Sequence, residues 1–81
     1  MKVTLYGAEW CAFCQTEKQW LESKSVSFDY VDVDDNKDAL DFLYNTLGSS
    51  GIPVTIVEDE DDKKHIIRGF NRQELSQHIG I

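Results

Sequence analysis

The chain has 81 residues, enough for one small domain with a single hydrophobic core and too few for two. Hydrophobic residues make up 41% of the sequence, which is too many for a disordered chain, yet no run approaches the roughly 18 apolar residues of a transmembrane helix. The formal net charge of −7 and the lack of a basic cluster argue against nucleic acid or an anionic membrane as a partner.

The first half of the chain predicts strand, helix, strand and helix. Residues 2–7 alternate apolar and polar side chains and stop at a glycine, which indicates a strand. Residues 12–24 contain neither Gly nor Pro and favour a helix that begins at the cysteines. Residues 26–34 are β-branched and aromatic, as in a second strand. A second helix follows, with Asp35 or Asn36 as its N-cap and Gly48 as its stop.

The second half of the chain predicts a β-hairpin and a last helix. Residues 53–58 and 65–68 are two short strands joined by an acidic turn, and Asn71 followed by Glu74 is close to a capping box for a helix over residues 72–79. Because a helix joins the first two strands, we expect them to be parallel. The whole chain, 1–81, is then one domain, and we expect it to act as a monomer.

The only two cysteines, Cys11 and Cys14, stand three positions apart at the start of the first predicted helix. The opening residues lack the apolar region of a secretory signal peptide, so we expect a cytoplasmic protein. Thiols are normally kept reduced in that compartment, which favours a catalytic or metal-binding pair over a structural disulfide. The unpaired N–H groups of a helix N-terminus favour a thiolate at Cys11, which predicts Cys11 as the nucleophile and Cys14 as the resolving cysteine.

A metal site is the alternative use of the same cysteines. A structural zinc site needs four ligands, and the only other soft candidates are His65 and His78, far away on a predicted strand and on the last helix. We therefore expect no bound metal. A non-catalytic module, in which the cysteines hold a metal or sense oxidation, remains the second hypothesis for function.

Three motifs carry a resemblance to a known family: "WCAFC" at residues 10–14, "GIPVTIV" at 51–57 and "RGF" at 68–70. In this order and on this pattern of elements, they resemble the glutaredoxin-like branch of the thioredoxin superfamily. The resemblance implies an α/β fold of order βαβαββα, with a four-stranded mixed sheet and three flanking helices. It also implies a dithiol oxidoreductase that reduces protein disulfides with a redox-active Cys11–Cys14 pair and no bound cofactor.

Two groups within this branch differ in their electron donor. Glutathione-dependent glutaredoxins usually have Gly-Gly and then an acidic residue that holds the tripeptide, whereas here Phe70 follows Gly69 and positions 71–73 are Asn, Arg and Gln. The pair Gly-Phe is similar to the NrdH-type redoxins, which take electrons from thioredoxin reductase and serve ribonucleotide reductase. Those proteins usually have Gln before the second cysteine, and this chain has Phe13. Thioredoxin reductase and glutathione therefore both remain candidate donors, and ribonucleotide reductase is a candidate substrate.

The resemblance also implies which residues contact a substrate protein. Trp10 would lie at the rim of the site, and Phe13 would shield the sulfur atoms, offer an apolar contact or simply pack. A cis peptide bond at Pro53 would face Cys11 and expose the backbone of Ile52 to a substrate chain. The expected contact residues are Trp10, Phe13, Ile52, Pro53, Gly69 and Phe70.

Glu17 falls in the middle of an arc on the first predicted helix that is formed by Phe13, Cys14, Trp20 and Leu21. Burial of a carboxylate there would raise its pKa towards neutrality. Three residues from Cys14, it could take that cysteine's proton, as a buried aspartate does in thioredoxins. The alternative is that the helix is rotated slightly, so that Glu17 reaches solvent or pairs with Lys18 or Lys24.

Overall fold

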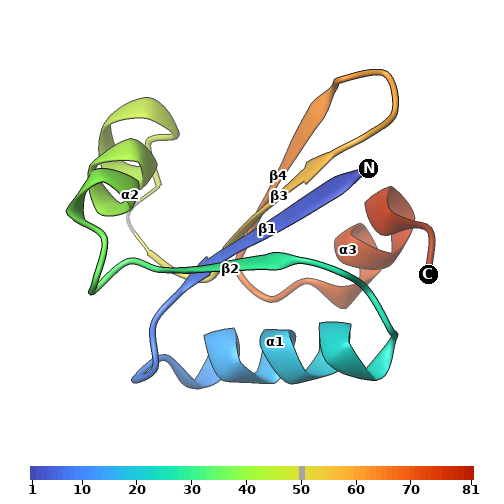
Figure 1. Ribbon diagram of the computed structural model, residues 1–81, viewed down its shortest axis with the longest axis horizontal. Helices are drawn as coiled ribbons and strands as arrows, with labels where there is room; N and C mark the ends of the chain where they lie inside the picture. The colour runs from blue at the N-terminus through green and yellow to red at the C-terminus, as the bar shows by residue number, and fades with distance from the viewer. Residues whose placement is uncertain (50) are drawn as a thin grey trace.

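The computed structural model describes residues 1–49 and 51–81, and its centre is a four-stranded mixed sheet of order β2-β1-β3-β4 (Figure 1). β1 runs parallel to β2 and antiparallel to β3, and β3 pairs with β4 as an antiparallel hairpin. The elements are β1 (Lys2–Gly7), α1 (Ala12–Ser23), β2 (Asp29–Asp32), α2 (Lys37–Asp41) continued by the π-helical turn η1 (Phe42–Thr46), β3 (Val54–Glu58), β4 (Lys64–Arg68) and α3 (Arg72–Ile79). The predicted order βαβαββα is confirmed.

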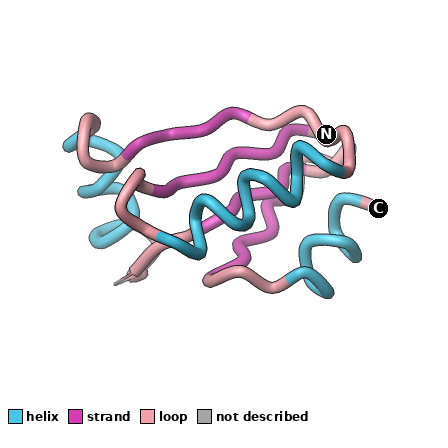
Figure 2. The backbone as a smooth tube through the Cα atoms, turned by 90° about the horizontal axis from the view of Figure 1, so that it is seen from below, coloured by secondary structure: helices cyan, strands magenta, loops and turns pink. Residues whose placement is uncertain are grey.

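The two faces of the sheet are covered by different helices. α1 and α3 lie on one face, and α2 with η1 lies on the other, over one end of the sheet (Figures 1 and 2). The alternation along β1 explains this, because Val3 and Leu5 point towards α1 and α3 while Tyr6 packs on Phe42 at a ring distance of 6.0 Å. The core therefore has two clusters, and the cysteines belong to the one that α2 and η1 help to close.

Side-chain N-caps start α1, α2 and α3, and the sequence predicted those of α2 and α3. Asn36 accepts the N–H of Ala39 through its side chain, and Asn71 accepts that of Glu74. In α1 the capping side chain is Cys11 itself, which accepts the N–H of Cys14. The start of α1 and the cysteine pair are thus one local structure.

The second strand is shorter than predicted, since only Asp29–Asp32 pair with β1. The residues before it form a loop: Ser25 has a positive φ of 58°, and the N–H of Val26 returns to the carbonyl of Leu21. Val26 and Phe28 pack against the core cluster without joining the sheet. These apolar side chains are buried from a loop. The sequence pattern alone could not distinguish such a loop from a strand.

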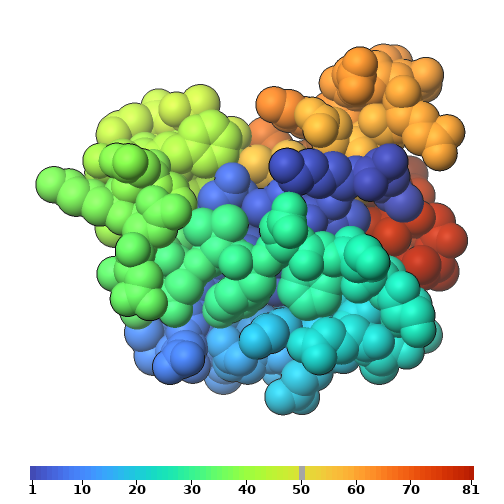
Figure 3. Space-filling view, in the orientation of Figure 1, coloured from blue at the N-terminus to red at the C-terminus, as the bar shows by residue number. Residues whose placement is uncertain are grey.

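The space-filling view shows a hollow between the α2–η1 segment and the β3–β4 hairpin (Figure 3). The hollow is lined by Lys2, Thr4, Tyr6, Phe42, Ile56, Glu58 and Lys64, and it measures about 190 Å³. Its lining includes neither cysteine, so this uncovered part of the sheet is separate from the redox centre. Among the residues that the structure describes, no helix is long and apolar enough to cross a membrane.

Candidate active site

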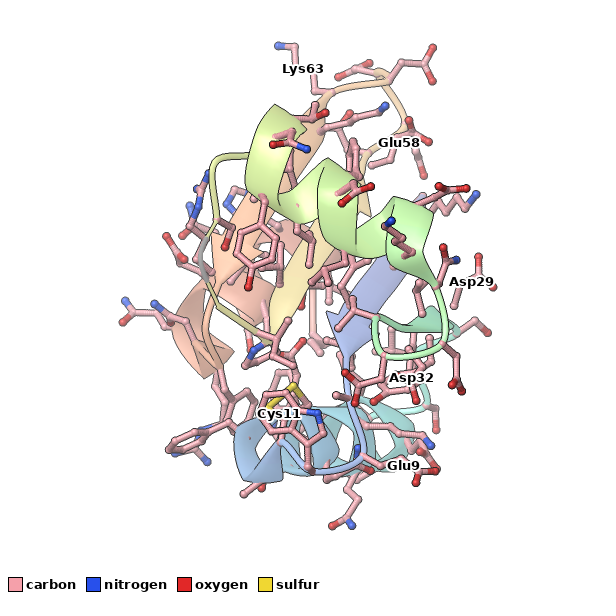
Figure 4. The ribbon with its side chains drawn as sticks, turned by 90° about the vertical axis from the view of Figure 1, so that its left-hand side faces the viewer. Glu9, Cys11, Asp29, Asp32, Glu58 and Lys63 are labelled. Carbon is pink, nitrogen blue, oxygen red and sulfur yellow. A yellow bond between two sulfur atoms is a disulfide. The ribbon has the colours of Figure 1, made fainter. Side chains whose placement is uncertain are left out.

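Cys11 and Cys14 form a disulfide at the N-terminus of α1, with their Cα atoms 5.2 Å apart (Figure 4). The N–H of Cys14 points at the Cys11 sulfur at 3.2 Å, and the carbonyl of Cys11 accepts the N–H of Gln15. The two cysteines differ sharply in access, because Cys11 is 8% exposed and Cys14 is 0% exposed. Only the Cys11 side of the pair can be reached by another molecule.

The Pro53 loop lies against the disulfide. The Ile52–Pro53 peptide bond is cis, as the sequence predicted. The Cys11 sulfur is 3.9 Å from the carbonyl oxygen of Ile52, so the loop before β3 is in direct contact with the exposed end of the pair. The carbonyl of Pro53 accepts the N–H of Gly69 at 2.8 Å, which ties this loop to the end of β4.

Two aromatic side chains stand exposed beside Cys11. Trp10 is 71% exposed and Phe13 is 68% exposed, so Phe13 does not pack in the core. The indole N–H of Trp10 donates to the Asp34 carboxylate at 2.6 Å, which fixes the ring at the rim of the site. Large apolar side chains exposed together are typical of a contact surface for another protein.

Two shallow grooves flank Ile52. One, of about 390 Å³, is lined by Trp10, Val33, Asp34, Leu40, Leu43, Tyr44, Ser49, Gly51 and Ile52. The other, of about 440 Å³, is lined by Gly48, Ser49, Gly51, Ile52, Pro53, Arg68 and Gly69. Both grooves share Ser49, Gly51 and Ile52, so both reach the residue whose carbonyl faces Cys11.

Phe70 differs from the other expected contact residues. Its ring is half-buried and meets Trp20 of α1 edge-on at 6.0 Å, so it packs against the core cluster beneath the sheet. Gly69, with φ of +78°, does line a groove beside Pro53, and its N–H is already bonded. The structure thus places Ile52 against Cys11, and Pro53 and Gly69 in a groove that Ile52 also lines. Trp10 and Phe13 are exposed next to the cysteines in the sequence, and Phe70 makes a packing contact.

Glu17 is fully buried, with 0% of its surface exposed. The alternative in which it reaches solvent or pairs with a lysine is therefore wrong. The hydroxyl of Thr55 on β3 donates a hydrogen bond to Glu17 Oε2, whereas Oε1 has no partner in the described part of the chain. Burial raises the pKa of Glu17 to about 7, against the opposing effect of the Thr55 hydrogen bond.

Sequence reasoning missed the residues that hold these groups in place. Thr55 is 38 positions from Glu17, and Asp34 is 24 positions from Trp10. Thr55 faces α1 because it alternates with Val54 along β3. A polar residue on the buried face of a predicted strand is the one sequence feature that could have pointed to a buried polar partner. The partner that it meets depends on how α1 crosses the sheet, which the sequence pattern does not specify.

The histidines lie away from the cysteines. His65 on β4 and His78 on α3 stack at a ring distance of 4.2 Å, and His65 pairs with Asp59 of the hairpin turn at 2.9 Å. Within residues 1–49 and 51–81, no group of three or more His, Cys, Asp or Glu side chains is placed to hold a metal ion.

Comparison with known proteins agrees with this geometry. A family model described as glutaredoxin matches residues 3–61. An uncharacterized glutaredoxin-like 8.6 kDa protein in the rubredoxin operon of Clostridium pasteurianum is 29% identical over 77 residues, which span 95% of this chain and 96% of that protein.

Two solved structures are similar over nearly the whole chain. The glutaredoxin-like NrdH-redoxin from Escherichia coli superposes with a TM-score of 0.82 at 25% identity, over 95% of this chain and 93% of that one. The glutaredoxin from Methanosarcina mazei Go1 gives a TM-score of 0.79 at 32% identity, over 99% of this chain and 79% of that one. With its redox-active Cys11–Cys14 pair on a thioredoxin-like fold, this chain therefore belongs to the glutaredoxin family of thiol–disulfide oxidoreductases.

Proposed function

We propose that the chain reduces disulfide bonds in other proteins, with Cys11 as the attacking and Cys14 as the resolving cysteine. The observation that carries this assignment is the difference in access between the two sulfur atoms, together with the Cys14 N–H that points at the Cys11 sulfur. That N–H stabilises negative charge on Cys11, because a helix N-terminus favours an anion.

The reaction proceeds in two exchanges. The Cys11 thiolate attacks a substrate disulfide, forms a mixed disulfide and releases the first substrate thiolate. The Cys14 thiolate then attacks Cys11, which breaks the mixed disulfide, releases the second substrate thiolate and forms the Cys11–Cys14 bond. Two electrons have passed to the substrate, and the donor must return two to reopen the pair.

Glu17 is suited to take the proton that Cys14 loses before the second exchange. It lies one turn further along the buried face of α1, and a carboxyl with a pKa of about 7 changes its charge readily near neutral pH. Cys14 has no access to solvent, so its proton needs an acceptor inside the protein. The unpartnered Oε1 of Glu17 supplies one.

The substrate chain crosses the site at Ile52. The carbonyl of Ile52 beside Cys11 offers a backbone hydrogen bond to an extended segment. The exposed side chains of Trp10 and Phe13 provide apolar contact next to it, and Trp10 lines the same groove as Ile52. Pro53 and Gly69 line the neighbouring groove. Phe70 acts indirectly in this arrangement, by packing α1 against the end of β4.

Thioredoxin reductase is the donor that the site favours over glutathione. Glutathione carries net negative charge, and the carboxylates of Glu9 and Asp32 stand on the same end of the molecule as Cys11 (Figure 4). Asp34 adds a third carboxylate at the rim. No acidic side chain stands at positions 71–73 to hold the amino end of the tripeptide. The structural neighbour from Escherichia coli is described as having a thioredoxin-like activity profile, which supports the same choice.

Ribonucleotide reductase is the candidate substrate by similarity to the NrdH-type redoxins, and the cytoplasm is the corresponding location. The acidic rim favours a substrate segment that carries Lys or Arg near its cysteines. The chain would act as a monomer, since the exposed side chains of Trp10 and Phe13 lie next to the cysteines and are needed for the substrate.

The donor can be tested by following NADPH consumption with the oxidised protein. We expect turnover with thioredoxin reductase, and a rate at least roughly tenfold lower with glutathione and glutathione reductase, because like charges at the site disfavour the tripeptide by more than about 1.4 kcal/mol. A protein disulfide serves as the final electron acceptor in both assays. Glutathione turnover at or above the rate with thioredoxin reductase would contradict the proposed donor.

A variant with neutral groups at the rim is the matched control. Replacing Glu9 and Asp32 with Gln and Asn removes two negative charges without changing the size of the side chains. If charge excludes glutathione, this variant gains glutathione turnover and shows a weaker dependence on salt. If its glutathione rate is unchanged, the acidic rim is not the reason for the preference.

A further inference from the structure

Gly7 leaves an opening between the end of β1 and the buried cysteine. A Cβ atom on Gly7 would come within 3.0 Å of the Cys14 Cβ and 3.1 Å of the Cys14 sulfur, both tighter than ordinary contacts. The same atom would lie 3.0 Å from the hydroxyl oxygen of Tyr30. The Cys14 sulfur and the Tyr30 hydroxyl therefore border one small space, which only a glycine at position 7 keeps clear.

Tyr30 reaches this space from β2. It pairs in register with Leu5 of β1, so its side chain lies on the face that α1 covers. The side-chain amide of Gln15 donates one hydrogen to the Tyr30 oxygen at 3.2 Å and the other to the carbonyl of Ala8 at 3.0 Å. The ammonium of Lys18 lies 4.9 Å from the ring centroid and holds the ring from outside.

These contacts leave the proton of the Tyr30 hydroxyl available. Gln15 is the donor in its bond to Tyr30, so the hydroxyl accepts there and its own O–H is directed elsewhere. Burial raises the pKa of the Tyr30 phenol, as do nearby carboxylates, so it keeps its proton at neutral pH. The charged groups around the phenol and the sulfur are Lys18 and Glu17 on α1, Glu9 between β1 and α1, Asp32 at the end of β2, and Asp34 just after it.

We propose that Tyr30 is a positioning residue for the resolving step, whose hydroxyl donates a hydrogen bond to the sulfur of Cys14 once the disulfide is reduced. The inference rests on the proposed function of Cys14. In the disulfide, the Cys14 sulfur is bonded to Cys11 and is a weak acceptor. After reduction it is a thiol, and when it loses its proton it becomes a thiolate, which is a strong acceptor. The proton stays on Tyr30 throughout, and the proton that Cys14 loses goes to Glu17.

This hydrogen bond has two opposite effects on the resolving rate. It stabilises the Cys14 thiolate, which increases the fraction of attacking species below the pKa of the thiol. It also makes that thiolate a weaker nucleophile, because the logarithm of the rate constant for attack falls by roughly 0.4–0.5 for each unit by which the thiol pKa is lowered. The hydrogen bond therefore speeds the resolving step at low pH and slows it at high pH. A purely structural role for the Tyr30 ring would not produce this reversal.

The test is a stopped-flow reaction of the reduced protein with an aromatic disulfide such as Ellman's reagent. Attack by Cys11 releases a first coloured thiolate in a bimolecular phase, and attack by Cys14 releases a second in a phase independent of concentration. For Tyr30→Phe, losing a hydrogen bond to a charged group raises the Cys14 thiol pKa by about one unit. We expect the second phase to be about threefold slower than wild type at low pH and about threefold faster above the thiol pKa.

Tyr6→Phe is the matched control, since Tyr6 loses the same hydroxyl on the opposite face of the sheet, where it packs on Phe42. We expect its pH profile to superpose on that of wild type. A Tyr30→Phe profile that superposes as well, or one that is slower by the same factor at every pH, would overturn the inference. If the wild-type protein releases no second thiolate at all, the proposed dithiol mechanism is wrong. That result differs from a failure of the Tyr30 inference, in which wild type still releases both thiolates.

Discussion

Replacing Cys11 with serine is expected to abolish reduction of a disulfide substrate, whereas Cys14→Ser should complete the first attack and stop at a mixed disulfide. Cys11 is the accessible sulfur, and a serine hydroxyl cannot replace the thiolate. The loss of turnover for Cys11→Ser should be at least about a thousandfold, as for other removed nucleophiles. Mass spectrometry of the protein after incubation with a disulfide peptide detects the trapped adduct on Cys14→Ser.

The two serine variants are controls for each other. Each variant lacks the Cys11–Cys14 disulfide, so both lose any stability that this bond provides. Thermal unfolding of the two variants measures that common loss. A metal site would lose its metal with either change, while the dithiol mechanism predicts an adduct with Cys14→Ser alone. Turnover by both variants, or an adduct on Cys11→Ser but not on Cys14→Ser, would show that the roles are assigned wrongly.

The parts of the site that sequence could predict are those fixed by short-range structure. The i, i+3 spacing of Cys11 and Cys14 at a helix start determines which sulfur caps the helix and which is buried one turn later. Asn36 and Asn71 were found as caps for the same reason, since a cap depends only on the next three residues. The cis bond before Pro53 was inferred from family resemblance, and the structure has it, with the carbonyl oxygen of Ile52 3.9 Å from the Cys11 sulfur.

The other contacts depend on how elements pack and were not predictable from local pattern. In the sequence, Tyr30 is an ordinary aromatic residue of a predicted strand. In the structure, the parallel register of β2 with β1 brings its hydroxyl to the space beside Gly7. Phe70 sits in a motif associated with binding, yet the crossing of α1 turns its ring onto Trp20. The apolar arc on α1 predicted that Glu17 could be buried. The sequence could not show that Thr55 of β3 would donate a hydrogen bond to it, because that contact depends on how α1 packs on the sheet.

Glu17→Gln should stabilise the protein above neutral pH and slow the resolving step. The folded-state pKa of Glu17 is raised from 4.5 to about 7, so between these values the folded protein holds a proton that the unfolded chain has lost. Stability conferred by the protonated carboxyl is therefore present at low pH and falls as pH rises to about 7. The raised pKa corresponds to about 3 kcal/mol, so at pH 8 the glutamine variant should be more stable by up to about that amount. Denaturant unfolding across this pH range measures it.

Glu22→Gln makes the same change at an exposed position of α1 and should leave the pH dependence of stability as in wild type. In the stopped-flow assay, loss of the proton acceptor at position 17 should slow the second phase by about a hundredfold or more, with the first phase unchanged. A carboxylate that lowers stability at neutral pH and also accelerates one step is consistent with a trade of stability for activity. If Glu17→Gln stabilises the protein but leaves the rate and pH profile of the second phase unchanged, Glu17 is not the base for Cys14.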